Sequence, residues 1–261
     1  MIRVFRAEWR KTRRPTLFIG TLVAITMVSI LTSSIFFLVM DEPRRGREVR
    51  VTKAMFEQAG GLTLGFANAG GLLGVVALCI FAAQMSQEYS LGTMRNLLVR
   101  QPRRITLLLG KYLSMASFAM LIVLVSAIVS VATSYVGANA KHLDTTLWNT
   151  SAAYHSLFLT FVNVLIATLG YGTIGIFLGI ILRSPISSIS IGLAWLLIIE
   201  GILAAVLTST RQWLPGQLLS IVAAGGDPDV SYSRALISAS LFMVLALVAS
   251  GLLFKRRDVS A

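Results

Sequence analysis

Residues 87–112 read QEYSLGTMRNLLVRQPRRITLLLGKY and form a short basic segment between two long apolar runs. The apolar positions of this segment recur at intervals of three, three and one, which places them on one face of a helix: Leu91, Met94, Leu97 and Leu98. Charged residues fill other positions: Glu88, Arg95, Arg100, Arg103 and Arg104. The pattern predicts an amphipathic helix that forms a cytoplasmic contact surface, resting on a membrane or on a partner.

The composition of the whole chain predicts a membrane protein. Hydrophobic residues make up 56% and charged residues 13% of the chain, and the mean hydropathy is +0.78. An average soluble domain carries about 25% charged residues. The formal net charge of +12 is also typical of nucleic-acid-binding proteins, but here the basic residues lie at the ends of apolar runs. We therefore expect the lipid bilayer as the partner, and no nucleic acid.

Six segments are long enough to cross the bilayer, for which about 20 apolar helical residues are needed. Lys111 lies near the start of the third segment, where its ammonium group is expected to reach the lipid headgroups. The sequence thus predicts an all-α polytopic membrane protein with one membrane domain over residues 1–261. Its expected spans are 16–40, 61–86, 105–135, 156–182, 185–207 and 235–254.

The distribution of basic residues predicts the orientation of these spans. Six spans place both termini on the same side of the membrane. With the termini inside, fifteen Lys and Arg residues fall on the cytoplasmic side and eight on the outer side. Five of those eight lie in the first outer loop, between Arg44 and Lys53, among acidic residues. Because positively charged loops remain inside, we expect both termini in the cytoplasm.

The N-terminal residues 1–15 combine an apolar and a basic face. Ile2, Phe5 and Trp9 follow one another at spacings of three and four, whereas Arg residues occupy another face. This periodicity predicts a helix that lies in the membrane interface. An unstructured basic tail is the alternative. A secretory signal is excluded because the following apolar run is too long and has no cleavage site.

Residues 208–234 are too short to span a membrane and too apolar for an ordinary loop. Breaks at Pro215-Gly216 and at Gly225-Gly226 predict two short helices that dip back from the outer face. A surface loop is the alternative. In the fourth span, Gly175 and Gly179 lie four residues apart, which predicts close packing against another helix.

Glu200 lies within the fifth apolar span, where an acid costs about 2.5–3.5 kcal/mol. Such a residue usually faces a cavity or binds a partner group. With Trp213 and Pro215 of the following segment, we assign Glu200 to a translocation path or outer gate. The alternative is a structural carboxylate bound to a neighbouring helix. Trp195 precedes Glu200 by five positions, so in a regular α-helix the two residues do not share a face.

A series of short motifs follows the second span: Glu88, Leu91-Gly92-Thr93, Leu97-Leu98, Pro102-Arg103-Arg104 and Leu109-Gly110-Lys111. In this arrangement the segment resembles the coupling region of bacterial type-2 ATP-binding-cassette (ABC) exporter permeases. The resemblance extends over essentially the whole chain, including the basic N-terminus, the six spans and the Leu214-Pro215 break. It implies an elbow helix over 1–15 with Ile2, Phe5 and Trp9, a coupling helix over 87–104 and an outer re-entrant segment over 208–234.

In this family the permease dimerises, and each copy seats its coupling helix in a groove on a separate nucleotide-binding ATPase subunit. The apolar face of the coupling helix is expected to enter that groove, and Pro102 to end the helix. The ATPase contact implied for this chain comprises Glu88, Leu91, Gly92, Thr93, Met94, Arg95, Leu97, Leu98, Arg100, Pro102, Arg103 and Arg104.

The resemblance also implies the other partners and the location. A second permease copy or a paralogue would complete the dimer in the inner or plasma membrane. ATP and Mg²⁺ would bind to the partner subunit, with no cofactor in this chain. The exported substrate would be an amphipathic drug, peptide or lipid-like compound.

The residues themselves offer no catalytic or metal site. Gly110-Lys111 lacks the rest of a phosphate-binding P-loop, and the two histidines have no HExxH spacing. The single cysteine, Cys79, excludes an intrachain disulfide. We therefore expect no enzyme activity in this chain. Two alternatives to a permease are a membrane anchor or assembly factor, and an ion-coupled transporter, which predicts an inverted repeat and several intramembrane acids.

Overall fold

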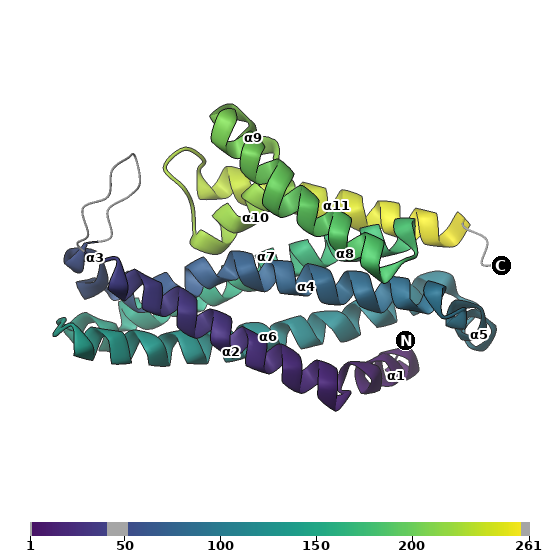
Figure 1. Ribbon diagram of the computed structural model, residues 1–261, viewed down its shortest axis with the longest axis horizontal. Coiled ribbons are helices and arrows are strands. Elements are labelled where there is room, and N and C mark those ends of the chain that lie inside the picture. The colour runs from purple at the N-terminus through teal and green to yellow at the C-terminus, as the bar shows by residue number, and fades with distance from the viewer. Residues whose placement is uncertain (1, 41–51, 257–261) are drawn as a thin grey trace.

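The computed structural model describes residues 2–40 and 52–256, and every regular element within these residues is a helix (Figure 1). Six helical segments are long and apolar enough to cross a membrane. The predicted all-helical fold with six helices able to span a membrane is therefore confirmed. The spanning segments are α2 (Pro15–Leu38), η1 (Ala59–Thr63) with α4 (Leu64–Ser90), α6 (Arg104–Ala140), α7 (Ser151–Leu182), α8 (Pro185–Leu193) with η3 (Ala194–Ile199) and α9 (Glu200–Val206), and α11 (Tyr232–Arg256).

Two of the spanning helices extend well beyond the predicted spans. α6 has 37 residues and α7 has 32. At about 1.5 Å per residue, α6 is roughly 55 Å long, compared with about 30 Å for the hydrocarbon core. Its last residues, 136–140, include Gly137 and Asn139, which are not apolar. The span predicted from hydropathy therefore ended before them, although the helix continues.

The short elements lie between the spans or before them. They are α1 (Ile2–Thr12), α3 (Lys53–Glu57), α5 (Thr93–Arg100), η2 (Thr146–Asn149), η4 (Thr208–Trp213) and α10 (Pro215–Ala224). Figure 1 shows α1, α5 and the end of α11 at one end of the bundle and α3 at the other. The helical α1 rules out the unstructured N-terminal tail. The arginines at 44–50, which were predicted for the first outer loop, lie outside the described residues.

The segment after the fifth span contains two short helices, η4 and α10, rather than a surface loop. α10 follows the break at Leu214 and Pro215 and ends at Gly225 and Gly226, whose φ angles are +82° and +128°. Positive φ at these positions suits glycine, which has no Cβ to clash with the backbone. The helix is packed inside the bundle against α7, α11 and α4. Its buried side chains are Leu218, Leu219, Ile221, Val222 and Ala223.

The centre of the bundle is the pair α4 and α7, which approach each other most closely at glycines. A Cβ on Gly175 would lie 2.4 Å from the carbonyl oxygen of Leu78, and one on Gly179 would lie 3.0 Å from that of Ala82. The predicted close packing through Gly175 and Gly179 is confirmed. Backbone contact of this kind is typical of membrane helices, which associate through small residues.

Gly175→Ala is expected to lower the stability of the chain by about 1–3 kcal/mol, because the new methyl group forces two packed backbones apart. Gly71→Ala on α4 is the matched control. A Cβ there would meet no atom within 4 Å, so the change should be neutral or stabilising by up to about 1 kcal/mol. Thermal unfolding in detergent measures both. Equal effects would contradict the close approach.

Much apolar surface remains exposed on the outside of the bundle. Only 11% of the apolar window of α11 and 17% of that of the α8–α9 segment are buried inside the chain. Side chains such as Leu197, Ile202 and Ile237 are 56–70% exposed. A soluble monomer rarely exposes so large a continuous apolar surface. Lipid, or another membrane helix, must cover these faces.

Candidate functional site

α5 is held in place by a turn at its start and a proline after its end. Gly92 precedes it with a φ of +64°, a left-handed conformation that glycine adopts at little cost. The helix ends at Arg100, two residues before Pro102, where the proline was expected to end it. The predicted bounds of 87–104 are wrong, because residues 87–90 continue α4, Leu91 and Gly92 form a turn, and Arg104 begins α6. Met94 is 1% exposed and belongs to a buried cluster with Phe81 and Leu107.

The apolar face of α5 therefore faces the bundle of its own chain, and this corrects the expected orientation. Leu97 and Leu98 pack partly against the same cluster as Met94, so these residues do not present a free apolar face to a partner. Leu91 is 66% exposed because it lies in the turn before α5. The surface that remains open combines Leu91, Val99, which is 78% exposed, and polar residues. These exposed polar residues are Thr93, Arg95, Asn96 and Arg100.

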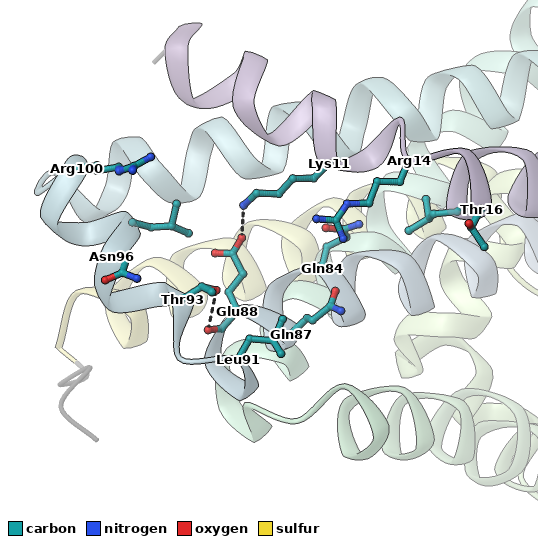
Figure 2. Close-up of a pocket in the computed structure, with 12 residues that line it drawn as sticks. Lys11, Arg14, Thr16, Gln84, Gln87, Glu88, Leu91, Thr93, Asn96 and Arg100 are labelled. Carbon is teal, nitrogen blue, oxygen red and sulfur yellow. Dashed lines mark hydrogen bonds and ion pairs between the residues drawn. The ribbon is translucent and has the colours of Figure 1, made fainter.

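A cluster of four charged side chains joins α1 to α4 and α6 directly beside α5. Lys111 Nζ lies 2.9 Å from Glu8 Oε2 and 2.8 Å from Glu88 Oε1. Lys11 Nζ lies 2.9 Å from Glu8 Oε1. It also lies 2.6 Å from Glu88 Oε1, the contact that Figure 2 shows as a dashed line. Two carboxylates and two ammonium groups balance in charge. We call these residues, Glu8, Lys11, Glu88 and Lys111, the charge cluster.

The charge cluster is largely buried, which corrects the expectation for Lys111. Lys111 is 2% exposed and does not reach headgroups, while Glu8 and Glu88 are 6% and 7% exposed. Buried charges require opposite partners, because the interior solvates them poorly. Glu88 Oε2 is buried and has no hydrogen-bond partner in the described residues. The Glu88 carboxylate does not cap α5; its main-chain oxygen instead accepts a hydrogen bond from Thr93 Oγ1 at 3.3 Å.

The pKa values of the two charged α1 residues in the cluster, Glu8 and Lys11, reflect these contacts. Burial alone raises the pKa of Glu8, but Lys111 and Lys11 outweigh it and hold that pKa below its ordinary value. Burial lowers the pKa of Lys11, but the hydrogen bonds from its ammonium group to Glu88 and Glu8 outweigh it and raise that pKa. Both groups are therefore charged across the physiological range, and each stabilises the other's charged form.

Two cluster members, Glu8 and Lys11, were not among the site residues predicted from the sequence. Glu8 is the only acid among the first 40 residues, and six basic residues precede residue 16. A lone acid on a basic helix is a signal that could have marked it. The close approach of α1 to α6 also depends on Gly110, because a Cβ there would lie 2.6 Å from Val4 Cγ1.

The other residues predicted for α1 and the α5 region do not belong to the charge cluster. Ile2 is 69% exposed, and the rings of Phe5 and Trp9 stack with centroids 6.2 Å apart. Arg104 donates hydrogen bonds to the main-chain oxygens of Phe254 and Lys255 at 3.2 and 3.1 Å. It thus connects the start of α6 to the last turn of α11, where a cation is favourable. Pro102 and Arg103 are exposed.

Away from the charge cluster, at the start of α9, Glu200 is fully buried and binds the first residues of α10. Its carboxylate accepts hydrogen bonds from Gly216 N at 3.2 Å and Gln217 N at 3.0 Å. It also accepts one from Trp195 Nε1 at 2.8 Å. The carboxylate therefore satisfies main-chain donors at the N-terminus of a helix, a position that favours negative charge.

The contact between Trp195 and Glu200 corrects the expectation that they lie on different faces. Residues 194–199 form a π-helix, in which hydrogen bonds run from i to i+5 and residues five apart share a face. Pro215 opens α10 next to Glu200, but Trp213 is 63% exposed. Tyr171 of α7 donates a hydrogen bond to Gly216 O at 2.7 Å and so holds the same turn from another side.

Comparison with known proteins gives a family but no activity. A family model described as "Protein of unknown function (DUF2705)" matches residues 61–260, which include α4 to α11. No curated protein matches the chain. The matched region contains Glu88, Lys111, α5 and Glu200, whereas Glu8 and Lys11 precede it. Within the described residues, no group of three or more His, Cys, Asp or Glu side chains could hold a metal ion.

Proposed function

The chain belongs to the DUF2705 family, whose function is unknown, and we propose that it is the permease subunit of an ABC exporter. In this proposal a separate ATPase subunit binds the exposed face of α5 and the turn before it. ATP and Mg²⁺ bind to that subunit, and a second permease copy or paralogue completes the membrane dimer. The substrate class is amphipathic: a drug, a peptide or a lipid-like compound.

One observation carries this proposal: α5 is a short basic helix whose buried side shares an apolar cluster with two spanning helices. Its buried residue Met94 belongs to one apolar cluster with Phe81 of α4 and Leu107 of α6. The charge cluster beside it ties α4 and α6 to α1. A push on α5 would therefore move the ends of two spans together. Transmission of movement by a rigid element is what coupling to a soluble motor requires.

The predicted ATPase contact divides into two groups in this proposal. Leu91, Arg95 and Arg100 are exposed and available for direct binding. Glu88, Met94 and Arg104 bind groups of their own chain and act by positioning α5. The permease half of the interface is thus mainly basic, and it fits an acidic groove with an apolar site for Val99 and Leu91.

The orientation with both termini in the cytoplasm belongs to the same proposal. α1, α5 and the end of α11 lie at one end of the bundle, and most of the chain's basic residues lie near them. This end would be cytoplasmic, with α1 as the interfacial elbow helix. α10, packed among α4, α7 and α11, would be the re-entrant segment on the outer side.

Val99→Asp is expected to weaken binding of the ATPase subunit by at least about tenfold, because a carboxylate replaces an exposed apolar contact at the centre of the basic face. The tagged full-length chain is purified from membranes of the cells that naturally produce it. A co-purifying protein with a P-loop is identified by mass spectrometry, and its ATPase activity is measured. Val99 is 78% exposed, so the change should not disturb folding.

Leu147→Asp is the matched control, since Leu147 is 48% exposed on η2 at the opposite end of the bundle. It should retain the ATPase subunit. Retention of the subunit by Val99→Asp, or equal loss in both variants, would remove α5 as the contact.

A membrane anchor or assembly factor remains the second candidate, because a basic helix also recruits soluble partners. That function predicts binding through α5 without ATP-dependent export from reconstituted vesicles.

A further inference from the structure

A cleft of about 880 Å³ lies between the α1–α2 corner and the end of α4 with α5. In Figure 2, Lys11 and Arg14 point from that corner towards Gln84 and Glu88 of α4. Asn96 and Arg100 line the α5 side. The other lining residues are Thr16, Leu17, Gln87, Leu91, Thr93 and Leu97.

The cleft contains two cations that no other group neutralises within the described chain. Arg14 and Arg100 are exposed, and neither side chain makes a hydrogen bond or ion pair with another described residue. Lys11 is different, because both Glu8 and Glu88 bind its ammonium group. The charge cluster is balanced, so the guanidinium groups give the cleft a net positive charge.

The neutral hydrogen-bonding groups around these cations can all donate to an anion. The amides of Gln84, Gln87 and Asn96 and the hydroxyl of Thr16 line the cleft, and the only acid, Glu88, is bound to two lysines. Guanidinium groups bind phosphate with two parallel hydrogen bonds, and amides add further donors. The chemistry of the cleft therefore fits a phosphate group.

The position of the cleft selects the source of that phosphate. α2 begins at Pro15 and α4 ends at Ser90, so the cleft lies where two spanning helices reach the membrane surface. The face of α2 that starts at Thr16 continues through Val23 and Met27, which are 48% and 61% exposed. An apolar stripe thus leads from the cleft along the spanning helix, as an acyl chain attached to a bound headgroup requires.

We propose that this cleft binds the phosphate of an anionic phospholipid through Arg14 and Arg100. The acyl chains of this lipid lie along Leu17 and the exposed stripe of α2. Because one bound lipid contacts both the α1–α2 corner and α5, it bridges the elbow and the proposed ATPase contact. The lipid site depends on neither the ATPase nor the transport activity, so it is tested on the chain alone.

The test is native mass spectrometry of the purified full-length chain with dioleoylphosphatidylglycerol or dioleoylphosphatidylcholine. We expect tighter retention of phosphatidylglycerol by the wild-type chain. The double variant Arg14→Gln/Arg100→Gln should bind it at least about tenfold more weakly, because two charge-assisted hydrogen-bonding groups are lost. Both side chains are exposed, so thermal stability should be retained.

The double variant Arg13→Gln/Arg95→Gln removes the same charge from neighbouring exposed positions that do not line the cleft. It should bind phosphatidylglycerol within about twofold of wild type, because dispersed surface charges contribute little. Equal loss in both double variants, or equal retention of the two lipids, would overturn the lipid site. Displacement of phosphatidylglycerol by excess inorganic phosphate would instead assign the cleft to a soluble phosphate and likewise overturn it.

Discussion

Lys111→Met is expected to lower the free energy of unfolding by about 3–5 kcal/mol, because it leaves buried charge without its partner. Glu8 loses one of its two ammonium partners and Glu88 keeps only Lys11, so the charge cluster becomes net negative. Thermal unfolding of the chain in detergent measures the loss. Because the cluster holds α1 on α6, trypsin should also cleave the arginine-rich α1 faster in this variant.

Two further variants separate the charge effect from a general effect of the substitution. Lys141→Met, at the far end of α6, removes an exposed lysine with no ion pair in the described chain and should change stability by less than about 1 kcal/mol. Glu8→Gln combined with Lys111→Met leaves Lys11 and Glu88 as a neutral pair and should recover part of the loss. If the stability losses of Glu8→Gln and Lys111→Met simply added in the double variant, the two residues would not be coupled. That result would contradict the charge cluster.

Glu200→Ala is expected to destabilise the chain by at least about 2 kcal/mol, because it removes the buried carboxylate that three donors share and leaves the buried main-chain N–H of Gly216 without its acceptor. The three donors are Trp195 Nε1 and the main-chain N–H groups of Gly216 and Gln217. The start of α10 would lose the acceptor that fixes it to the fifth span. Thermal unfolding in detergent measures the stability, and hydrogen exchange at residues 216–217 should show faster exchange of these amides.

The export role of Glu200 is tested with Glu200→Gln, which keeps the shape and one carbonyl acceptor. If Glu200 lines the translocation path, this variant should lose export while expression and ATPase activity stay normal. Unchanged export would remove it from the path and leave its structural role. Glu57→Ala is the stability control, since Glu57 pairs with exposed Lys53 at 3.5 Å and a surface pair contributes about 0–1 kcal/mol.

Sequence reasoning located the spans because their signal is local. A run of about 20 apolar residues is stable only in hydrocarbon, so composition alone identifies the solvent of each segment. The same reasoning placed the break at Pro215 and Gly216 and the close-packed Gly175 and Gly179. The predicted span ended too early for α6 and began too late for α7, because both helices continue with polar residues that a hydropathy pattern excludes.

The candidate site was predicted only in part. The spacing of apolar residues in α5 predicted an apolar face. A local pattern does not show whether that face packs against a partner or against the same chain. Met94 faces its own bundle because α4, α6 and α11 offer apolar surface beside it. Trp195 and Glu200 meet because the helix between them takes a π conformation, which the residue spacing alone does not reveal.

The amino-acid sequence by itself determined that this chain is helical, has six helices long and apolar enough to cross a membrane, and carries a short basic helix between the second and third of them. Only the tertiary structure decided which charged groups meet: Glu8 and Lys111 are 103 residues apart in sequence and form a 2.9 Å ion pair. The physical reason is that solvent preference is a property of each segment, whereas a buried charge is stable only where the packing of several helices supplies its partner.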